Sequence, residues 1–340
     1  MNLQERIEAA VFLGKTILEG DEYLDAVIHR TSFHNPWLTK ENQNQALKAI
    51  AEKFLSKDAL EQWVSQYHVE DQPNTKIVGL IMAGNIPVVG FHDFLSVFIS
   101  GHKSLIKLSE KDPFVFPYLL KIMEKANDAV AKMYELTERL EGFDAVIATG
   151  SNNSSRYFEA YFGKYPNIIR RNRNSVGVLT GKESDAELLA LGGDIFQYFG
   201  LGCRNVSKVY LPSGYDRKHL LEILHEYREL VLHDKYKHNF DYNFALLSLN
   251  RIPFDINGCI ILTENPALQS RIAALHYEYY DDLDTLEDEL ERKSAEIQCI
   301  VSGKEVAFKK TESLEFGKSQ QPGLTDYPDG VDVMAFLTSL

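Results

Sequence analysis

The spacing of apolar residues along the chain changes at about residue 76. In the first 75 residues apolar side chains recur at intervals of three and four, for example at Leu47, Ile50 and Phe54, as in a helix buried on one side. From Lys76 onward, short apolar runs alternate with stretches of helical spacing. The pattern predicts an N-terminal helical segment over residues 1–75 and an α/β arrangement after it.

The chain from Lys76 to Phe199 repeats a strand followed by a helix. Strands are expected at 76–84, 102–109, 143–150 and 174–181, and helices at 85–100, 113–130, 152–162 and 184–199. Strands joined through helices by right-handed crossovers form a parallel sheet that is covered on both faces. Ligands bind such sheets beyond the carboxyl ends of the strands. The turns expected at that edge are 83–87, 108–113 and 149–153.

A second α/β region follows and ends near residue 315. Its strands are expected at 204–212 and near 244–249, 258–262, 272–277 and 297–301. The last residues are rich in glycine, proline and aspartate, and we expect them to form a separate segment. The sequence therefore predicts four parts, at 1–75, 76–190, 191–315 and 316–340.

Charge and composition exclude several classes of protein. The net charge is −13, from 36 Lys and Arg against 49 Asp and Glu, which disfavours nucleic-acid binding because that binding needs clustered positive charge. We expect no membrane span, since no run approaches the ~18 apolar residues that a span needs, and the N-terminus lacks signal-peptide features. The 3 cysteines form no CxxC pair, so we expect a reduced, cytoplasmic chain without a disulfide framework or a metal site.

Cys203 is the candidate nucleophile. It lies in a turn with Gly200 and Gly202, and Arg204 follows it directly. Glycines let a backbone approach a ligand closely, and a neighbouring cation stabilises the thiolate that acts as a nucleophile. A structural cysteine in a tight turn is the alternative, and the local sequence favours neither interpretation.

Familiar nucleotide and hydrolase motifs are absent from the sequence. It contains no GxGxxG, no GxSxG and no GxxxxGK[ST], which removes the commonest serine hydrolases and P-loop phosphotransferases. Gly150-Ser151 ends an expected strand and opens an expected helix, where backbone N–H groups can receive phosphate oxygens. Many crossover turns contain such a pair, so this signal alone has little specificity.

Four turns taken together carry a resemblance to a known family. In chain order they are Ala83-Gly-Asn85-Ile-Pro87, Lys107-Leu-Ser-Glu110, Thr149-Gly-Ser151 and Gly200-Leu-Gly-Cys203. Their order resembles the aldehyde dehydrogenase superfamily. The longer motifs AGNIPVVGFHDFL, GHKSLIKLSEKDP, YFGLGCRNVSKVY and FGKSQQPGLTDY resemble its acyl-CoA reductase branch, which includes the fatty acid reductase of bacterial bioluminescence. This implies an aldehyde-dehydrogenase-like α/β fold, with a Rossmann-type cofactor domain at 76–190, a catalytic domain at 191–315 and a returning tail.

The resemblance also implies roles for individual residues at the reacting centre. Cys203 would be the nucleophile, and Asn85 would hold the oxyanion together with the backbone N–H of Cys203. Glu264 would orient the nicotinamide ribose, although the Phe-Gly-Pro that accompanies this carboxylate in the family is absent here.

The cofactor is implied in the same way. Lys107 would contact the adenosine ribose, with Ser109 and Glu110 beside it, and Gly150 and Ser151 would approach the pyrophosphate. The resemblance implies NADPH. The residues leave NADH open, since Lys107 and Ser109 could accept a 2′-phosphate and Glu110 would repel one.

One departure from the family sets the expected reaction. Hydrolytic members carry a glutamate that activates water, whereas the corresponding stretch Ile169–Ser175 has three arginines and no carboxylate. We therefore expect reduction of a long-chain acyl-CoA, or another acyl thioester, to an aldehyde through a cysteine-bound acyl-enzyme. The alternatives are a CoA-acylating dehydrogenase of short aldehydes, a phosphate-releasing semialdehyde dehydrogenase, and an inactive relative that serves an acyl-activating enzyme. Such an enzyme and a second copy of the chain are the expected protein partners.

Overall fold

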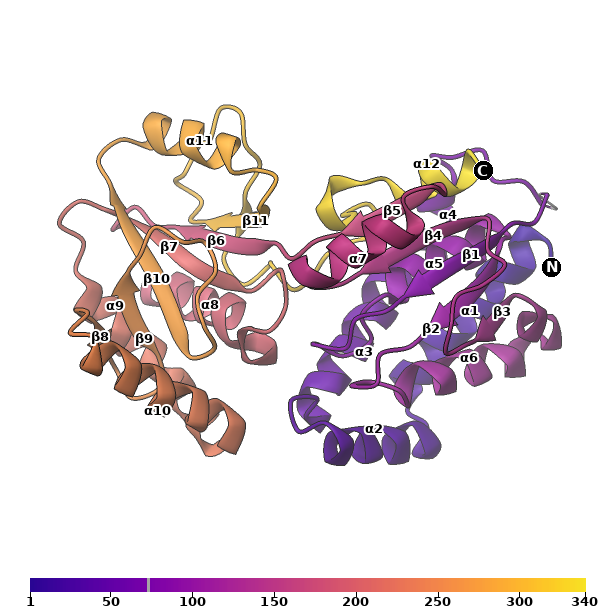
Figure 1. Cartoon of the computed structure of the whole chain (residues 1–340), viewed down its shortest axis with the longest axis horizontal. Coiled ribbons are helices and arrows are strands. Elements are labelled where there is room, and N and C mark those ends of the chain that lie inside the picture. The colour runs from indigo at the N-terminus through magenta and orange to yellow at the C-terminus, as the bar shows by residue number, and fades with distance from the viewer. Residues whose placement is uncertain (72–73) are drawn as a thin grey trace. The chain divides into compact units, whose positions relative to one another are not determined.

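The computed structural model describes residues 1–71 and 74–340 and divides the chain into two compact units (Figure 1). Unit 1 comprises Met1–Asn172 and Pro322–Leu340, and unit 2 comprises Arg173–Gln321. The C-terminal tail is thus shared, with residues up to 321 in unit 2 and the rest in unit 1. In the described part of the chain, every helix is too short or too polar to cross a membrane.

Unit 1 contains a five-stranded parallel sheet in the order β3-β2-β1-β4-β5. Its strands are β1 (Ile77–Ile81), β2 (Lys103–Lys107), β3 (Tyr134–Leu136), β4 (Ala145–Thr149) and β5 (Asn167–Arg170). The chain runs outward from β1 through β2 to β3, and then returns to the other side of β1 at β4. The strand order therefore reverses between β1 and β4, which is the position where open parallel sheets bind ligands.

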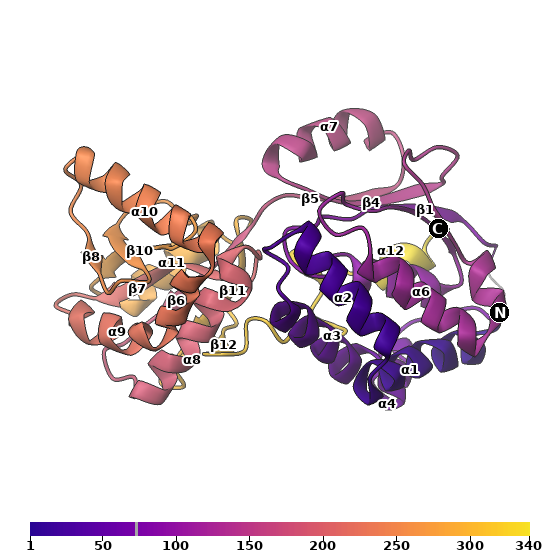
Figure 2. The same cartoon turned by 90° about the horizontal axis from the view of Figure 1, so that it is seen from below.

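Helices cover both faces of this sheet (Figure 2). The helices α5 (Phe91–Ser100) and α6 (Val115–Ala126) lie on one face, and α7 (Asn152–Phe162) lies on the other. Because both faces are covered, the central strands are apolar over most of their length, as in the sequence IVGLI of β1.

The N-terminal helices add a further layer over α5 and α6. They are α1 (Leu3–Glu19), α2 (Glu22–His34), α3 (Lys40–Phe54) and α4 (Lys57–Val64), and the expected helical segment is confirmed. Each begins at a side-chain cap, formed by Asn2, Asp21, Thr39 and Ser56 respectively. The helix α1 packs on both α5 and α6, and the C-terminal α12 (Val333–Thr338) packs on α5.

Unit 2 contains a seven-stranded sheet in the order β12-β11-β6-β7-β10-β9-β8. The strands are β6 (Asn174–Val178), β7 (Val206–Pro212), β8 (Asp255–Ile256), β9 (Ile261–Glu264), β10 (Ala274–Tyr280), β11 (Ile297–Ser302) and β12 (Leu314–Glu315). All pairs are parallel except β8 with β9. One core lies between the sheet and α8 (Asp185–Phe196) and α9 (Arg217–Leu224), with α10 (Asp234–Leu249) on the same side (Figure 1). A second core lies under α11 (Leu283–Arg292) on the other face.

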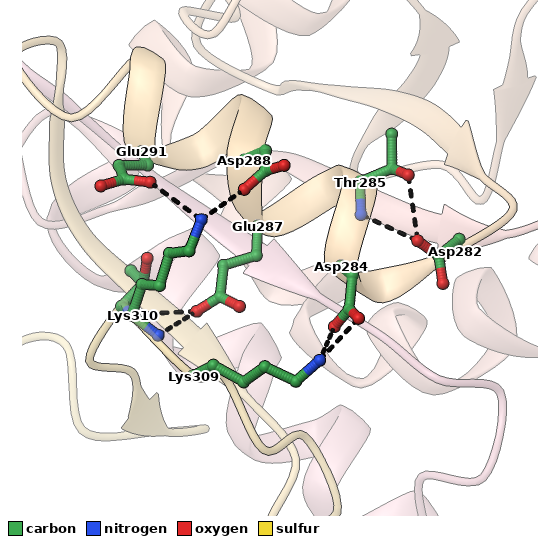
Figure 3. A network of polar contacts seen from close by, with 9 residues as sticks. Asp282, Asp284, Thr285, Glu287, Asp288, Glu291, Lys309 and Lys310 are labelled. Carbon is green, nitrogen blue, oxygen red and sulfur yellow. Dashed lines mark hydrogen bonds and ion pairs between the residues drawn. The ribbon is translucent and has the colours of Figure 1, made fainter.

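The helix α11 also binds the chain that follows β11 (Figure 3). The buried carboxylate of Glu287 accepts hydrogen bonds from the backbone N–H groups of Lys310 and Thr311, at 2.6 and 3.0 Å. The ammonium group of Lys309 contacts both carboxylate oxygens of Asp284, at 2.7 and 2.6 Å. Residues 309–311 are thereby attached to the acidic side of α11.

Two local expectations need correction, and two strands were not expected. Residues 244–249 are the last turns of α10 and not a strand, because Tyr236, Phe240 and Asn243 of that helix are buried at helical spacing. The helix expected from residue 85 begins only at Phe91, after Gly90 at φ 91°. The strands β3 and β5 were not expected. The strand β5 ends at Arg170, and a charged residue at that position is not typical of a buried strand.

Candidate functional site

The carboxyl ends of β1, β2 and β4 lie side by side at one edge of the unit 1 sheet. The predicted turns follow these three strands directly, so their expected position is confirmed. Six of the predicted site residues are brought to this edge, namely Asn85, Lys107, Ser109, Glu110, Gly150 and Ser151.

The turns after β1 and β2 contact each other closely. A Cβ atom on Gly84 would lie 2.5 Å from Ser109 Oγ and 2.7 Å from Ser109 Cβ, so only glycine fits there. Asp112 Oδ2 accepts a hydrogen bond from the backbone N–H of Val88 at 2.9 Å. Val88 adopts a left-handed conformation with φ 55°, which this bond helps to hold. Burial raises the pKa of the Asp112 carboxyl group, and the hydrogen bond from Val88 opposes that rise.

The N-terminal helices support the second turn. His34 Nε2 lies 2.7 Å from the carbonyl oxygen of Glu110, and Asn35 Nδ2 donates to the carbonyl oxygen of Lys111 at 3.2 Å. Both residues are at the C-terminal end of α2. The helical segment therefore holds the loop that carries Ser109 and Glu110.

The third turn begins α7. Ser151 caps this helix, because its Oγ accepts a hydrogen bond from the N–H of Ser154 at 3.2 Å. A Cβ atom on Gly150 would lie 2.8 Å from the Phe158 ring, so the glycine lets α7 pack against the end of β4. Both residues thus have structural roles, and they place the amino end of a helix, with its partial positive charge, beside the reversal point of the sheet.

This edge fits a dinucleotide cofactor. A helix N-terminus and the exposed ammonium group of Lys107 suit phosphate oxygens. Lys107 Nζ donates to the carbonyl oxygen of Glu138 at 2.7 Å. The exposed Glu110 offers a carboxylate suited to ribose hydroxyl groups.

Cys203 lies in unit 2, in the turn before the amino end of β7. Its side chain is exposed, whereas Cys259 is fully buried and Cys299 is partly buried. The carbonyl oxygen of Cys203 accepts a hydrogen bond from Ser175 Oγ at 3.0 Å. The predicted nucleophile is therefore accessible in unit 2, and its backbone is attached to the start of β6.

Asn205 holds the Cys203 turn, although it was not singled out in the sequence. Its side chain is 2% exposed, and its Oδ1 accepts a hydrogen bond from the N–H of Gly202 at 2.8 Å. Its Nδ2 donates to carbonyl oxygens at the end of α8, of Gln197 at 2.8 Å and of Asp194 at 3.0 Å. One buried amide thus connects the turn to the preceding helix.

The chain between α8 and Cys203 is strained. Tyr198 and Phe199 have φ values of 52° and 58°, and Gly200 follows at 74°. A left-handed conformation costs a residue other than glycine roughly 1–2 kcal/mol. Both aromatic side chains are buried, so packing holds the strained turn in place. Strain of this kind is concentrated at functional sites in proteins.

The tail motif FGKS is attached to the same helix. Asp194 Oδ2 accepts from the N–H of Gly317 at 2.6 Å, and its Oδ1 accepts from the N–H of Ser319 at 3.0 Å. Burial raises the pKa of the Asp194 carboxyl group, and these hydrogen bonds oppose the rise. Arg204 Nη1 donates to the carbonyl oxygen of Ser319 at 3.4 Å. The tail and the nucleophile turn are therefore bound to one another through α8 and Arg204.

The structure does not bring Glu264 to Cys203. Glu264 is the last residue of β9, whereas Cys203 precedes the first residue of β7. Since β7, β10 and β9 are parallel neighbours, the two residues lie at opposite edges of the sheet. Glu296, which precedes β11, is a carboxylate at the Cys203 edge. In residues 1–71 and 74–340, no three His, Cys, Asp or Glu side chains group as metal ligands.

Comparison with solved structures identifies the architecture. Aldehyde dehydrogenase 21 from Physcomitrella patens, in complex with succinate, superposes with a TM-score of 0.72 at 11% identity, over 100% of this chain and 84% of the other. The chain has the aldehyde dehydrogenase fold. The expected fold class is thereby confirmed.

Two further neighbours agree. KauB, an aldehyde dehydrogenase from Pseudomonas aeruginosa, gives a TM-score of 0.64 at 12% identity, over 90% of this chain and 73% of that one. A variant of aldehyde dehydrogenase C from Pseudomonas syringae, complexed with NAD+ and octanal, gives 0.65 at 12% identity, over 89% and 72%. No family profile and no curated protein sequence matches the chain.

Proposed function

We propose that the chain is an NAD(P)H-dependent oxidoreductase that reduces a long-chain acyl thioester, such as an acyl-CoA, to an aldehyde. The observation that carries this proposal is the exposed thiol of Cys203, held in a constrained turn on a chain with the aldehyde dehydrogenase fold. The neighbour complexed with NAD+ and octanal supports a nicotinamide cofactor and an aldehyde as product.

The chemistry assigned to the chain is nucleophilic. The Cys203 thiolate attacks the carbonyl carbon of the thioester, the bond to the CoA sulfur breaks, and an acyl-enzyme and free CoA result. A nicotinamide cofactor held by Lys107, Ser109, Gly150 and Ser151 would supply a hydride. The Cys203 sulfur leaves as a thiolate when the acyl carbon becomes an aldehyde.

Release of the acyl group to water is disfavoured by the surroundings of the 169–175 stretch. Asp93 is the carboxylate that Arg170 contacts, in a buried pair with Nη1–Oδ2 at 2.5 Å and Nη2–Oδ1 at 2.8 Å. Glu159 is bound to Arg171 at 2.6 Å. These two carboxylates are poor general bases because arginines engage them, which favours a thiol as the acyl donor and acceptor.

Asn85 is proposed as a donor to the oxyanion, on the resemblance and its place in the turn after β1. Losing one such donor typically lowers the rate by ~10²–10³-fold. We therefore expect Asn85→Ala to lower kcat by a factor in this range while Cys203 still forms the acyl-enzyme.

Mass spectrometry of the intact protein tests the proposal. After incubation with palmitoyl-CoA without reductant, wild type and the matched control Cys259→Ser should gain one acyl group, located on Cys203 by peptide mapping. Cys203→Ser should lose thioester-linked acylation and NADPH oxidation. Acylation elsewhere, or full activity in Cys203→Ser, would overturn the mechanism.

Two further measurements place the activity more narrowly. A series of acyl-CoA chain lengths separates a long-chain reductase from an enzyme of short aldehydes, because only the former should improve as the chain lengthens. Fluorescence titration with NADPH and NADH decides the cofactor, and Glu110→Gln should strengthen NADPH binding if Glu110 faces the ribose. The expected partners, an acyl-activating enzyme and a second copy of the chain, stay predictions.

A further inference from the structure

The three cysteines of unit 2 have different surroundings. Cys259 is 0% exposed in the core under α9, and burial raises the pKa of its thiol to about 11. Cys203 is exposed and Cys299 is partly exposed. A reagent in solution can therefore reach Cys203 and Cys299, while Cys259 is shielded and protonated at neutral pH.

A single hydroxyl group connects the two accessible cysteines. Ser175 Oγ lies 3.0 Å from the carbonyl oxygen of Cys203 and 3.0 Å from Cys299 Sγ. The Cys299 sulfur is thus no more than two hydrogen-bond lengths from the backbone of Cys203, although the residues belong to distant parts of the sequence.

Irregular strand pairing creates this arrangement. Cys203 precedes β7 and Cys299 lies on β11, with β6 and its Ser175 between the two strands. The pairing of β11 with β6 shifts register between Ile297 and Ile300, and the pairing of β6 with β7 shifts next to Ser175. Ile297 and Ile300 are both buried, so β11 does not alternate regularly through Cys299. Bulges redirect side chains and are frequent beside active sites.

We propose that Cys203 and Cys299 form a reversible disulfide after oxidation by a peroxide, with Cys299 as the resolving cysteine. The Cys203 thiolate attacks one peroxide oxygen, the O–O bond breaks, and a sulfenic acid and hydroxide (or an alkoxide) form. The leaving hydroxide takes a proton from the solvent and becomes water. The Cys299 sulfur then attacks the Cys203 sulfur, the S–O bond breaks, and the leaving hydroxide takes up the thiol proton as water. The two thiols lose two electrons in total, which the peroxide accepts.

Closing the disulfide requires a local rearrangement, because β6 lies between β11 and β7. The two sulfur atoms must come within about 2.05 Å, so the Ser175 hydroxyl group has to leave Cys299 and the Cys203 side chain has to turn toward β11. The bond would protect Cys203 from irreversible oxidation to a sulfinic acid, and a dithiol would restore it. This inference goes beyond the proposed reduction of thioesters, since a disulfide can form whether or not that activity exists.

Peptide mapping after oxidation tests the inference. The reduced full-length chain is treated with hydrogen peroxide, blocked with iodoacetamide and digested without reductant. We expect a peptide linking Cys203 to Cys299 within one chain, a loss of two hydrogen masses from the intact protein, and full reversal by dithiothreitol. Cys259→Ser, the matched control, should keep the linked peptide. In Cys299→Ser the linked peptide should disappear and Cys203 should proceed to the sulfinic acid.

The peptide map of the oxidised wild-type protein tests the inference even if a variant fails to fold. A sulfinic acid on Cys203 without the linked peptide, a disulfide between two chains, or a link from Cys203 to Cys259 would each overturn the inference. These outcomes are separate from the test with palmitoyl-CoA. A protein that forms the disulfide but no acyl-enzyme would overturn only the proposed function, and the reverse result would overturn only the disulfide.

Discussion

Replacing Asn205 should loosen the turn that carries Cys203. In Asn205→Ala the N–H of Gly202 loses its acceptor, and the carbonyl oxygens of Gln197, Asp194 and Ile195 lose a donor. In Asn205→Asp the acceptor for Gly202 remains, but an oxygen atom faces the three carbonyl oxygens where the amide group donated. Asn205→Asp therefore removes only the hydrogen bonds to α8, whereas Asn205→Ala also removes the hydrogen bond to Gly202.

The size of the effect follows from the burial of these groups. A buried polar group that loses its partner costs about 1–3 kcal/mol, while a group that water can reach costs less. Asp194 and Ile195 are 1% and 5% exposed, whereas Gly202 is partly accessible to solvent. We expect Asn205→Ala to lower the free energy of unfolding of unit 2 by roughly 2–4 kcal/mol. Asn205→Asp should cost at least as much at neutral pH and recover toward acid pH, where a protonated carboxyl group can donate.

Urea unfolding and alkylation measure the two consequences. The control is Asn239→Asp, a partly exposed amide that donates one bond to the carbonyl oxygen of Lys235 at 2.7 Å. Alkylation of Cys203 by iodoacetamide, followed by peptide mapping, should change its pH profile in both Asn205 variants, while Cys259 stays protected. If Asn205→Ala unfolds like wild type and Cys203 reacts at an unchanged rate at every pH, then Asn205 does not position the turn.

Other predictions concern unit 1. Arg170→Met should destabilise the chain by about 3–5 kcal/mol, because it leaves the buried Asp93 carboxylate without its ion pair, and the double variant with Asp93→Leu should recover much of that loss in urea unfolding. Equal costs for single and double variants would contradict this. Burial lowers the pKa of His102, so the free energy of unfolding should fall as the pH drops below about 6.5. His102→Gln should reduce the difference between unfolding curves at pH 5 and pH 7, and an unchanged difference would contradict this prediction. In Gly84→Ala the new methyl group should clash with Ser109 and lower the free energy of unfolding by about 1–3 kcal/mol. NADPH binding, measured by fluorescence titration, should weaken, and unchanged binding would show that this turn is not part of the cofactor site.

Much of unit 1 could be predicted from the sequence because parallel strands leave a simple pattern. The runs that became β1 and β4 are mostly apolar, and β2 has an apolar centre at Leu105 and Ile106, since the middle of each strand is buried. The position of the three turns followed from the topology alone. By contrast, β5 ends in Arg170, whose charge is neutralised by Asp93 from α5. A strand of this kind cannot be recognised locally, because its polar residue is matched by one far away in the sequence.

The mistaken strand at 244–249 has a different cause. A short apolar run such as Phe244–Leu249 fits a buried strand or the end of a helix equally well, and only longer spacing distinguishes them. In the structure the burial of Tyr236, Phe240 and Asn243 shows that the helical spacing begins well before this run. The six residues 244–249 are therefore too few to distinguish the spacing of a helix from that of a strand.

The edge of the sheet at which a candidate residue lies could be predicted where it directly follows a strand of unit 1, and not where it depends on the order of the strands in unit 2. Glu264 was a candidate because of the family resemblance, and its strand runs parallel to β7 and places it at the edge away from Cys203. Predicting this edge requires the strand order of the whole sheet, and no local pattern encodes that order. Glu296 lies at the Cys203 edge because β11 pairs in parallel with β6.

The position of Cys203 itself depends on bonds between remote segments rather than on a strand end. The turn precedes β7 at the amino edge, where no general rule for parallel sheets predicts a site. It is fixed through Asn205 to α8, and α8 is fixed through Asp194 to Gly317 and Ser319. The motif FGKS therefore matters for the nucleophile although it lies more than a hundred residues away. A substitution at Asp194 should thus alter the reactivity of Cys203, although Asp194 acts on it only through α8 and Asn205. The same hydrogen bonds explain why motifs from separate parts of the chain are informative only when considered together.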